Sequence, residues 1–285
     1  LKNMSPIYIN NKKIESIYTN NQSIGKVYVG DVLVFQKNNY NSDPFNELTI
    51  DTRLAGSASN TFILPLLSID HVTVDWGDGA VEHFLIAGSK THVYDTPGIY
   101  TVKMYGTGSQ MFRFSNAGDR YKVISGVIGN TGWTSLAYTF YGCSSMTALD
   151  VSGLDVSAIT NFEGAFHSCS SLISLDASAW AMSSNLLPTS YVATFGMCGA
   201  LDLKIGAGWN FSALTGGYNA STFLSGTDIG STNYDNMLSI IASQTLNNNV
   251  TFGGGNSKYT AAGKVHRDAI IASNNWTFND GGLAT

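Results

Sequence analysis

Charged side chains are scarce in this chain of 285 residues, which has 15 lysines and arginines and 20 aspartates and glutamates. Their share of 12% is about half of what a soluble domain usually carries. Because 44% of the residues are hydrophobic, the chain can bury a core, and a charge-rich disordered protein is excluded. The net charge of -5, without a cluster of lysines and arginines, argues against a nucleic-acid binder.

Long apolar runs are also missing, and no run approaches the ~18 residues of a membrane-spanning helix, so no membrane insertion is expected. Residues 1–6 lack the apolar core of a secretory signal, so we expect a chain that is not exported by that route or has lost its signal. The three cysteines, Cys143, Cys169 and Cys198, are an odd number without CxxC spacing. Their regular spacing predicts buried free thiols in a repeat, with a Cys143–Cys169 disulfide as the alternative.

The first 43 residues contain a ten-residue repeat, with copies at 7–11, 17–21 and 27–31. Each copy places an apolar and aromatic segment before an Asn, Gly or Asp pair that suits a tight hairpin turn, which predicts a small β-meander over 1–43. Hairpins of this size bury too little to stand alone, so we expect them to pack on the next module, on copies of themselves or on a partner protein. The expected anchoring contacts are Tyr8, Tyr18 and Tyr28.

The second module, residues 44–108, alternates strand-like segments with turns. Segments 62–66 and 72–74 are predicted strands. The motif WGDG at 76–79, followed by the HxYxxPGxYTV pattern at 92–102, is similar to the PKD-type immunoglobulin-like β-sandwich. The resemblance implies a sandwich that acts as a spacer or a contact module and not as a catalyst.

A longer repeat follows, marked by phenylalanines that are 26, 29 and 28 residues apart. These are Phe140, Phe166, Phe195 and Phe223. The spacing is typical of leucine-rich repeats. One unit cannot bury its own apolar side chains, so we expect the units to stack around one continuous core.

The amino-acid sequence of the repeat resembles the bacterial BspA-like leucine-rich-repeat family. The resemblance is clearest at residues 155–176, which have the sequence DVSAITNFEGAFHSCSSLISLD. Phe162 and Ala165 stand where that pattern has methionines. The resemblance covers about 110–230 and implies a leucine-rich-repeat solenoid over residues 109–285.

A cap is expected at the end of such a solenoid, over about 231–285. Apolar periodicity predicts helices at 233–241 and 261–272, and residues 276–278 a last strand. The predicted fold is therefore mainly β with some α: a β-meander, a PKD/Ig-like β-sandwich and a repeat solenoid with a helical C-terminal cap.

Residues that could carry chemistry do not converge in the sequence. The chain has only four glutamates and no recognisable facing carboxylate pair, GxSxG elbow or HExxH helix. Asp75 and Asp78 could help to bind calcium, and His83 and His92 could face each other across a hairpin and bind a metal, but turn and core roles explain them better. We therefore predict no catalytic residue, no metal and no cofactor.

Seven aromatic residues lie between the core positions of the repeats. Those that reach the surface are expected to recognise a protein or a sugar, and the alternative is that they fill the core. They are Trp133, Tyr138, Tyr141, Trp180, Tyr191, Trp209 and Tyr218.

The arrangement of a PKD-like unit directly before such repeats resembles the arrangement in Bacteroidetes-type surface proteins and in phage or prophage tail proteins. We expect a non-enzymatic virion protein of a bacteriophage, in a tail fibre or another surface appendage. The expected partners are other virion proteins or further copies of this chain at the N-terminal module, and a host surface glycan or protein at the repeats.

Three features favour the virion over a bacterial surface: the missing signal, the missing wall-sorting tail, and the segment VYVGDVLVF at 27–35, which resembles segments of phage structural proteins. A bacterial cell-surface adhesin, exported to the extracellular surface, is the alternative. A polysaccharide-degrading enzyme is the third hypothesis.

Overall fold

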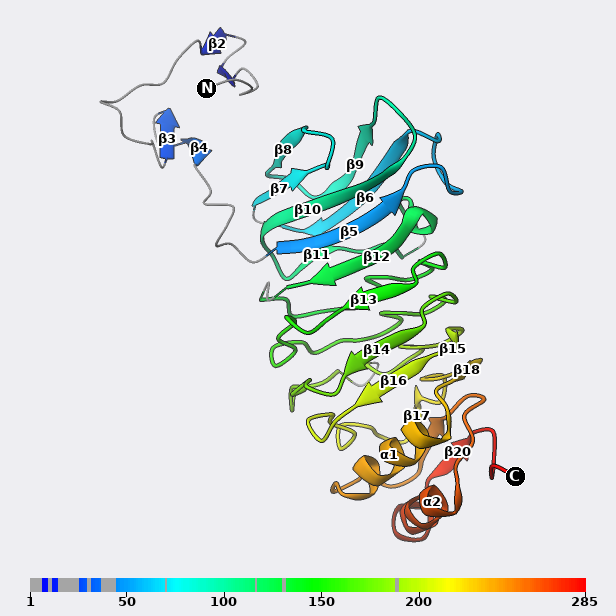
Figure 1. Ribbon diagram of the computed structural model, residues 1–285. Coiled ribbons are helices and arrows are strands. Elements are labelled where there is room, and N and C mark those ends of the chain that lie inside the picture. Colours follow the sequence, from blue (N-terminus) through cyan, green and yellow to red (C-terminus); the bar gives the residue numbers. More distant parts are fainter. Residues whose placement is uncertain are drawn as a thin grey trace. The chain divides into compact units, whose positions relative to one another are not determined.

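The computed structural model describes residues 45–285, apart from 70, 116, 130, 131, 188 and 189, and four short strands before residue 45. The chain divides into two units, Leu1–Asp43 and Pro44–Thr285. In the described residues the fold is mainly β with two α-helices, as predicted (Figure 1).

The N-terminal unit contains two antiparallel hairpins. Strand β1 (Ile7–Ile9) pairs with β2 (Lys12–Ile14), and β3 (Lys26–Val29) pairs with β4 (Val32–Gln36). These two antiparallel pairs agree with the hairpins predicted for the first and third copies. The second copy, which contains Tyr18 and would join the hairpins in the predicted meander, lies outside the described residues, as do the side chains of Tyr8 and Tyr28.

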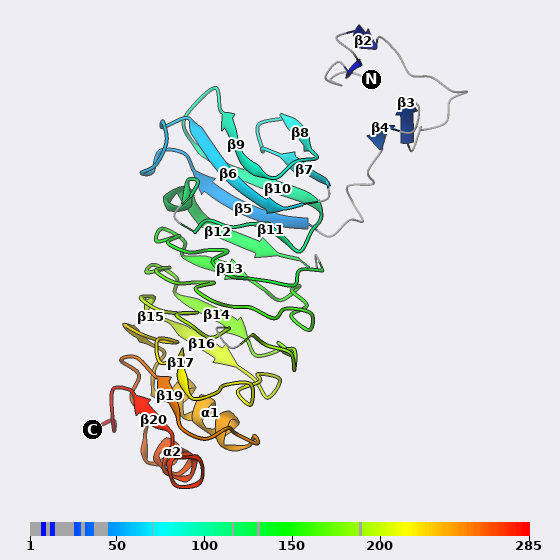
Figure 2. The ribbon, with the colours of Figure 1, turned by 180° about the vertical axis from the view of Figure 1, so that it is seen from behind.

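The larger unit begins with two sheets that lie over one another (Figures 1 and 2). One has six strands in the order β13-β12-β5-β10-β7-β8, and the other has three in the order β11-β6-β9. The side chains between the sheets are buried, for example Leu48, Phe62 and Val102. The strands are β5 (Phe45–Asp51), β6 (Thr61–Ser68), β7 (His71–Asp75), β8 (Val81–Phe84), β9 (Gly88–Val93), β10 (Ile99–Thr107), β11 (Gln110–Phe112), β12 (Val123–Ile128) and β13 (Ala148–Asp150).

The boundary predicted between residues 108 and 109 does not separate two cores. Strand β11 pairs with β6, and β12 pairs antiparallel with β5, so both sheets extend past the predicted boundary. Strand β12 then pairs in parallel with β13, which starts the repeat region. The sheets and the repeats therefore share one continuous unit.

Beyond β13, parallel pairs join residues that are about one repeat apart. Leu175 lies opposite Leu203, Gly199 opposite Thr227, and Phe252 opposite Phe278. Successive repeat units thus lie on one another in register. The strands are β14 (Ser174–Ala177), β15 (Gly199–Ala200), β16 (Asp202–Ile205), β17 (Gly217–Ala220), β18 (Thr227–Asp228), β19 (Val250–Gly253) and β20 (Thr277–Asn279).

Around each repeat phenylalanine the backbone forms a ladder of turns. The amides of Tyr138, Phe140 and Gly142 donate to carbonyls of the next unit at 2.8 Å, while the residues between them donate within their own unit. Around Phe140, Phe166 and Phe195 the ladder places the second residue before and the second residue after the phenylalanine in the left-handed region, as for Tyr138 (φ 56) and Ser168 (φ 60). Such values are uncommon for residues with a Cβ and mark positions held by the surrounding structure.

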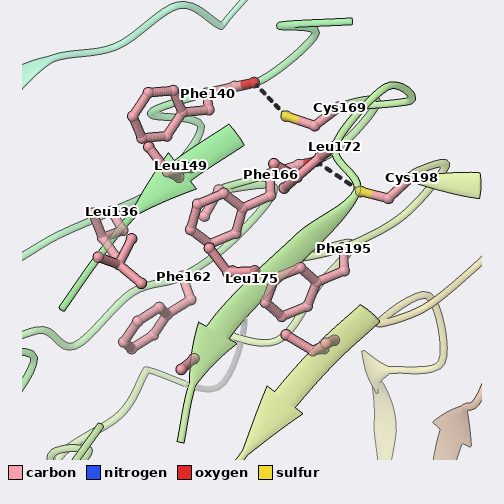
Figure 3. Close-up of a cluster of buried hydrophobic side chains, with 14 of the residues drawn as sticks. Leu136, Phe140, Leu149, Phe162, Phe166, Cys169, Leu172, Leu175, Phe195 and Cys198 are labelled. Carbon is pink, nitrogen blue, oxygen red and sulfur yellow. Dashed lines mark hydrogen bonds between the residues drawn. The ribbon is translucent and has the colours of Figure 1, made fainter. Parts of the chain in front are cut away.

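The repeat phenylalanines form a row in the core (Figure 3). The ring centroids of Phe140 and Phe166 are 6.0 Å apart, and those of Phe166 and Phe195 are 5.2 Å apart. The thiols lie beside this row: Cys169 donates to the Phe140 carbonyl at 3.1 Å, and Cys198 donates to the Phe166 carbonyl at 3.0 Å.

The three cysteines are buried and free, as predicted. The alternative disulfide between Cys143 and Cys169 is wrong. Burial raises the pKa of each thiol, so the thiols remain protonated and act as small apolar side chains.

The two predicted helices are confirmed as α1 (Ser231–Ala242) and α2 (Ala261–Asn274). Thr260 caps α2 by accepting a hydrogen bond from the Ala262 amide at 3.2 Å, and its own amide donates to Asp235 of α1 at 2.9 Å. Helix α2 ends at Asn274, and Asn275, which follows it, has a left-handed conformation. The predicted last strand is confirmed as β20.

Candidate recognition site

Four of the seven aromatic residues predicted to recognise a partner are buried in the core. The exposed fractions of Trp133, Trp180, Tyr191 and Trp209 are 0%, 3%, 1% and 1%. Side chains with so little exposure cannot contact a partner. The prediction is therefore wrong for these four, which fill the core as the alternative proposed.

A second aromatic row explains the burial of Trp180, Tyr191 and Trp209. The rings of Trp180 and Trp209 stack with centroids 5.7 Å apart. The Trp209 indole donates to the Ala177 carbonyl at 2.9 Å, and the Tyr191 hydroxyl donates to the Asn210 carbonyl at 2.5 Å, so the polar atoms of these two rings are paired inside the protein. The two tryptophans are 29 residues apart, as are Phe166 and Phe195, and this spacing is the sequence signal for a core row.

Tyr138 and Tyr141 are half-buried on the turn that holds Phe140. Their ring centroids are 5.7 Å apart. The ring of Tyr141 also stacks on His167 of the next unit, at 4.8 Å and with 7° between the ring planes. We call Tyr138, Tyr141 and His167 the aromatic ridge. The side chain of Tyr218 lies outside the described residues.

Two glycines make room for these rings. A Cβ atom at Gly164 would lie 2.7 Å from Cδ1 of Tyr138, and one at Gly196 would lie 2.8 Å from Cδ2 of His167. Real Cβ atoms do not approach other atoms so closely. The ridge therefore depends on glycine at the contact point in the following repeat unit.

Two arginines lie beside the tyrosines of the ridge. The guanidinium carbon of Arg113 is 4.6 Å from the ring centroid of Tyr138, in cation–π geometry. The Arg120 side chain lies against Gly142, and its guanidinium is 4.4 Å from the ring of Tyr121. Arg120 also donates to the Tyr121 hydroxyl at 2.6 Å. The arginines thus lie at the two ends of the segment from Tyr138 to Gly142.

The remaining polar groups of the ridge are neutral or internally paired. The Tyr138 hydroxyl donates to the Glu163 carboxylate. Burial, followed by this hydrogen bond and the charge of Glu163, raises the pKa of Tyr138 to about 12. Burial also lowers the pKa of His167, whose Nδ1 pairs with the Ser168 hydroxyl at 2.8 Å. The ridge therefore presents aromatic rings, with two guanidinium groups beside them.

Two surface pockets lie elsewhere in the larger unit. One, of about 420 Å³, is beside Asp202 and Asn233, and these two side chains hydrogen-bond to each other at 2.8 Å. The other, of about 580 Å³, is beside Ser221 and Asp280. Neither pocket is lined by a residue of the ridge.

The residues weighed as metal ligands have other partners. Asp75 and Asp78 accept hydrogen bonds from the amides of the turns that follow them, and Asp78 also pairs with His92 at 2.7 Å. His83 pairs instead with the Thr73 hydroxyl at 2.8 Å. Within the described part of the chain, no group of three or more His, Cys, Asp or Glu could hold a metal ion.

None of the described helices is long and apolar enough to cross a membrane. Comparison with protein families, with curated proteins and with solved structures finds no match to this chain. Its function must therefore be inferred from its own residues.

Proposed function

We propose that this chain is a non-enzymatic structural protein of a bacteriophage virion that recognises the host surface through the aromatic ridge. In this proposal the protein belongs to a tail fibre or another surface appendage. The N-terminal hairpins attach it to other virion proteins or to further copies of itself. The two-sheet region acts as a PKD-like immunoglobulin-type spacer, and the stacked units form a BspA-like leucine-rich-repeat solenoid with a helical cap.

Sequence resemblance and geometry support different parts of this proposal. The motifs WGDG and HxYxxPGxYTV support the spacer, and the segment at 27–35 supports the virion. The parallel register of units about one repeat apart is the arrangement that a solenoid requires. The division of the chain at Asp43 suits an attachment module that is separate from the rest.

The observation that carries the recognition role is the ridge itself. Its three rings come from two successive repeat units and are held by stacking and by the glycines of the following units. Aromatic rings on a rigid support bind partners at a low cost in conformational entropy. Two guanidinium groups beside them add directional hydrogen-bond donors.

Replacing Tyr141 by alanine is expected to weaken binding of the full chain to host cells by about tenfold or more, as for an interface hot spot. Tyr141→Phe keeps the ring and is expected to keep most of the binding. Val265→Ala, at a residue of α2 that is 68% exposed, is the matched surface control. Flow cytometry with labelled protein measures the effect, and equal binding by Tyr141→Ala and Val265→Ala would refute the role of the ridge.

The second candidate is a bacterial cell-surface adhesin, which the resemblance to BspA-like repeats favours. In this alternative the same ridge recognises the partner, but the protein is on a bacterial cell and not on a virion. Electron microscopy with a gold-labelled antibody against the full chain separates the two. Labelled phage tails support the virion protein, whereas label on bacterial surfaces without phage supports the adhesin.

A reducing-end assay on host polysaccharide tests the enzyme hypothesis, and released chain ends would overturn the non-enzymatic proposal.

A further inference from the structure

The four arginines of the chain fall into two pairs with different surroundings. Arg53 donates to Asp51 at 2.7 Å, and Arg267 donates to Asp280 at 2.9 Å, so each has a carboxylate partner. Arg113 and Arg120 face tyrosine rings, as Arg267 also does with Tyr259 at 4.9 Å, but they differ from Arg267 in their charged partners. Among the residues that the structure describes, no carboxylate forms an ion pair with either of them. Both belong to the surroundings of the aromatic ridge.

The position of these two arginines is informative because the chain has few charges. In a protein with a net charge of -5, two half-buried cations without an ion-pair partner, set against the single carboxylate of Glu163, leave a local excess of positive charge at the ridge. A guanidinium is a planar fork that pairs with a carboxylate through two parallel hydrogen bonds. Arg113 contacts the face of Tyr138, a contact that uses none of its N–H donors.

The Glu163 carboxylate is not an ion-pair partner of these arginines. Its Oε1 accepts the hydrogen bond from the Tyr138 hydroxyl, and the carboxylate is not ion-paired with Arg113 within the described chain. The local arrangement is therefore two cationic donors at the ends of the segment from Tyr138 to Gly142, with tyrosine rings between them. A ligand that matches it carries carboxylates and has flat apolar faces.

We propose that the ridge binds an acidic polysaccharide built from uronic acids, with sugar carboxylates at Arg113 and Arg120 and sugar rings lying against Tyr138 and Tyr141. This rests on the proposed function and names its ligand class. A neutral glycan would leave the two arginines without an anionic partner, and a phosphate polymer has no ring to lie on the tyrosines. Neither of the two pockets described above lies at the ridge, which suits a linear polymer that lies across the rings better than a small molecule, which needs a pocket.

The test measures binding of the full chain by isothermal titration calorimetry. The probes are an oligogalacturonate, its fully methyl-esterified form and inorganic polyphosphate. Esterification removes the charge but keeps the sugar rings, so the ester is expected to bind at least about tenfold more weakly than the acid. Polyphosphate keeps the charge but lacks the rings, and it is expected to bind more weakly than the acid as well. This comparison uses the wild-type chain and does not depend on the folding of a variant.

The variants Arg113→Gln and Arg120→Gln are each expected to weaken oligogalacturonate binding by about tenfold. Arg53→Gln makes the same change at an arginine that lies outside the ridge and is expected to bind like the wild type. Equal affinity for acid and ester, equal or tighter binding of polyphosphate, or an equal loss in Arg53→Gln would overturn the inference. If the chain binds host cells but not the oligogalacturonate, the ligand class is wrong and the recognition role stands. If it does not bind host cells, the proposed function fails.

Discussion

Replacing Phe166 by alanine is expected to lower the free energy of unfolding by about 3–5 kcal/mol. The ring is 1% exposed and stacks between Phe140 and Phe195, at 6.0 and 5.2 Å. Truncation therefore removes contacts with both neighbouring units and leaves a cavity between them. Urea unfolding followed by tryptophan fluorescence measures the loss, since the buried tryptophans of the unit report its packing.

The control for this variant lies in the same repeat unit. Ile173 is 68% exposed, so Ile173→Ala is expected to change the free energy of unfolding by less than about 0.5 kcal/mol. Equal shifts of the unfolding midpoint for Phe166→Ala and Ile173→Ala would contradict the stacking of repeat units around a shared phenylalanine row.

Replacing Lys122 by alanine is expected to cost about 3–5 kcal/mol, because it breaks a buried ionic network. The side chain is fully buried, and its ammonium donates to the carbonyls of Ala58 at 2.8 Å and Thr61 at 2.7 Å, with the Asp119 carboxylate at 3.9 Å. Burial lowers the pKa of Lys122, and Asp119 acts in the opposite direction. Without the ammonium, the two carbonyls lose a hydrogen-bond donor and the Asp119 carboxylate loses a nearby positive charge inside the protein.

Lys103→Ala is the matched control. Lys103 forms a surface ion pair with Glu47 at 3.7 Å and is 41% exposed, so its loss is expected to cost less than about 1 kcal/mol. The Lys122 network ties the loop before β6 to the turn η1 (Arg120–Lys122), which carries Arg120 and Tyr121. A small, equal effect of the two lysine variants in thermal unfolding would show that this anchor does not hold the turn in place.

The regular spacing of phenylalanines and cysteines in the sequence was sufficient to predict the core of the repeat region. Stacking preserves the position of a residue within its unit, so Phe166 stacks on its counterpart Phe195, and Cys198 repeats with Phe166 the hydrogen bond that Cys169 makes with Phe140. The helices α1 and α2 were also predictable, since their apolar periodicity and the Asn-Asn end of α2 are local signals. The pairing of β12 with β5 was not predictable. It joins segments that are far apart in the sequence through backbone hydrogen bonds, and these leave no pattern in the sequence.

The candidate site was predicted only in part. Tyr138 and Tyr141 were among the seven aromatic residues, but the sequence could not separate them from Trp180 and Trp209, which the stacking buries. His167, Arg113 and Arg120 were missed because their contacts depend on the register between units. A signal existed in Gly164 and Gly196, since a repeat position that changes to glycine marks a place where a neighbouring ring lies flat on the backbone.

Hydroxyl-radical footprinting of the full chain on host-cell envelopes tests the central claim most directly, because it reports which side chains lose solvent contact on binding. The account predicts that oxidation of Tyr138, Tyr141 and His167 falls when envelopes are added. Oxidation of Leu85 and Val265, which are 72% and 68% exposed and lie outside the ridge, is expected to stay unchanged. Unchanged oxidation at Tyr141 and His167, with protection at Leu85 or Val265, would place recognition on another surface and contradict the account.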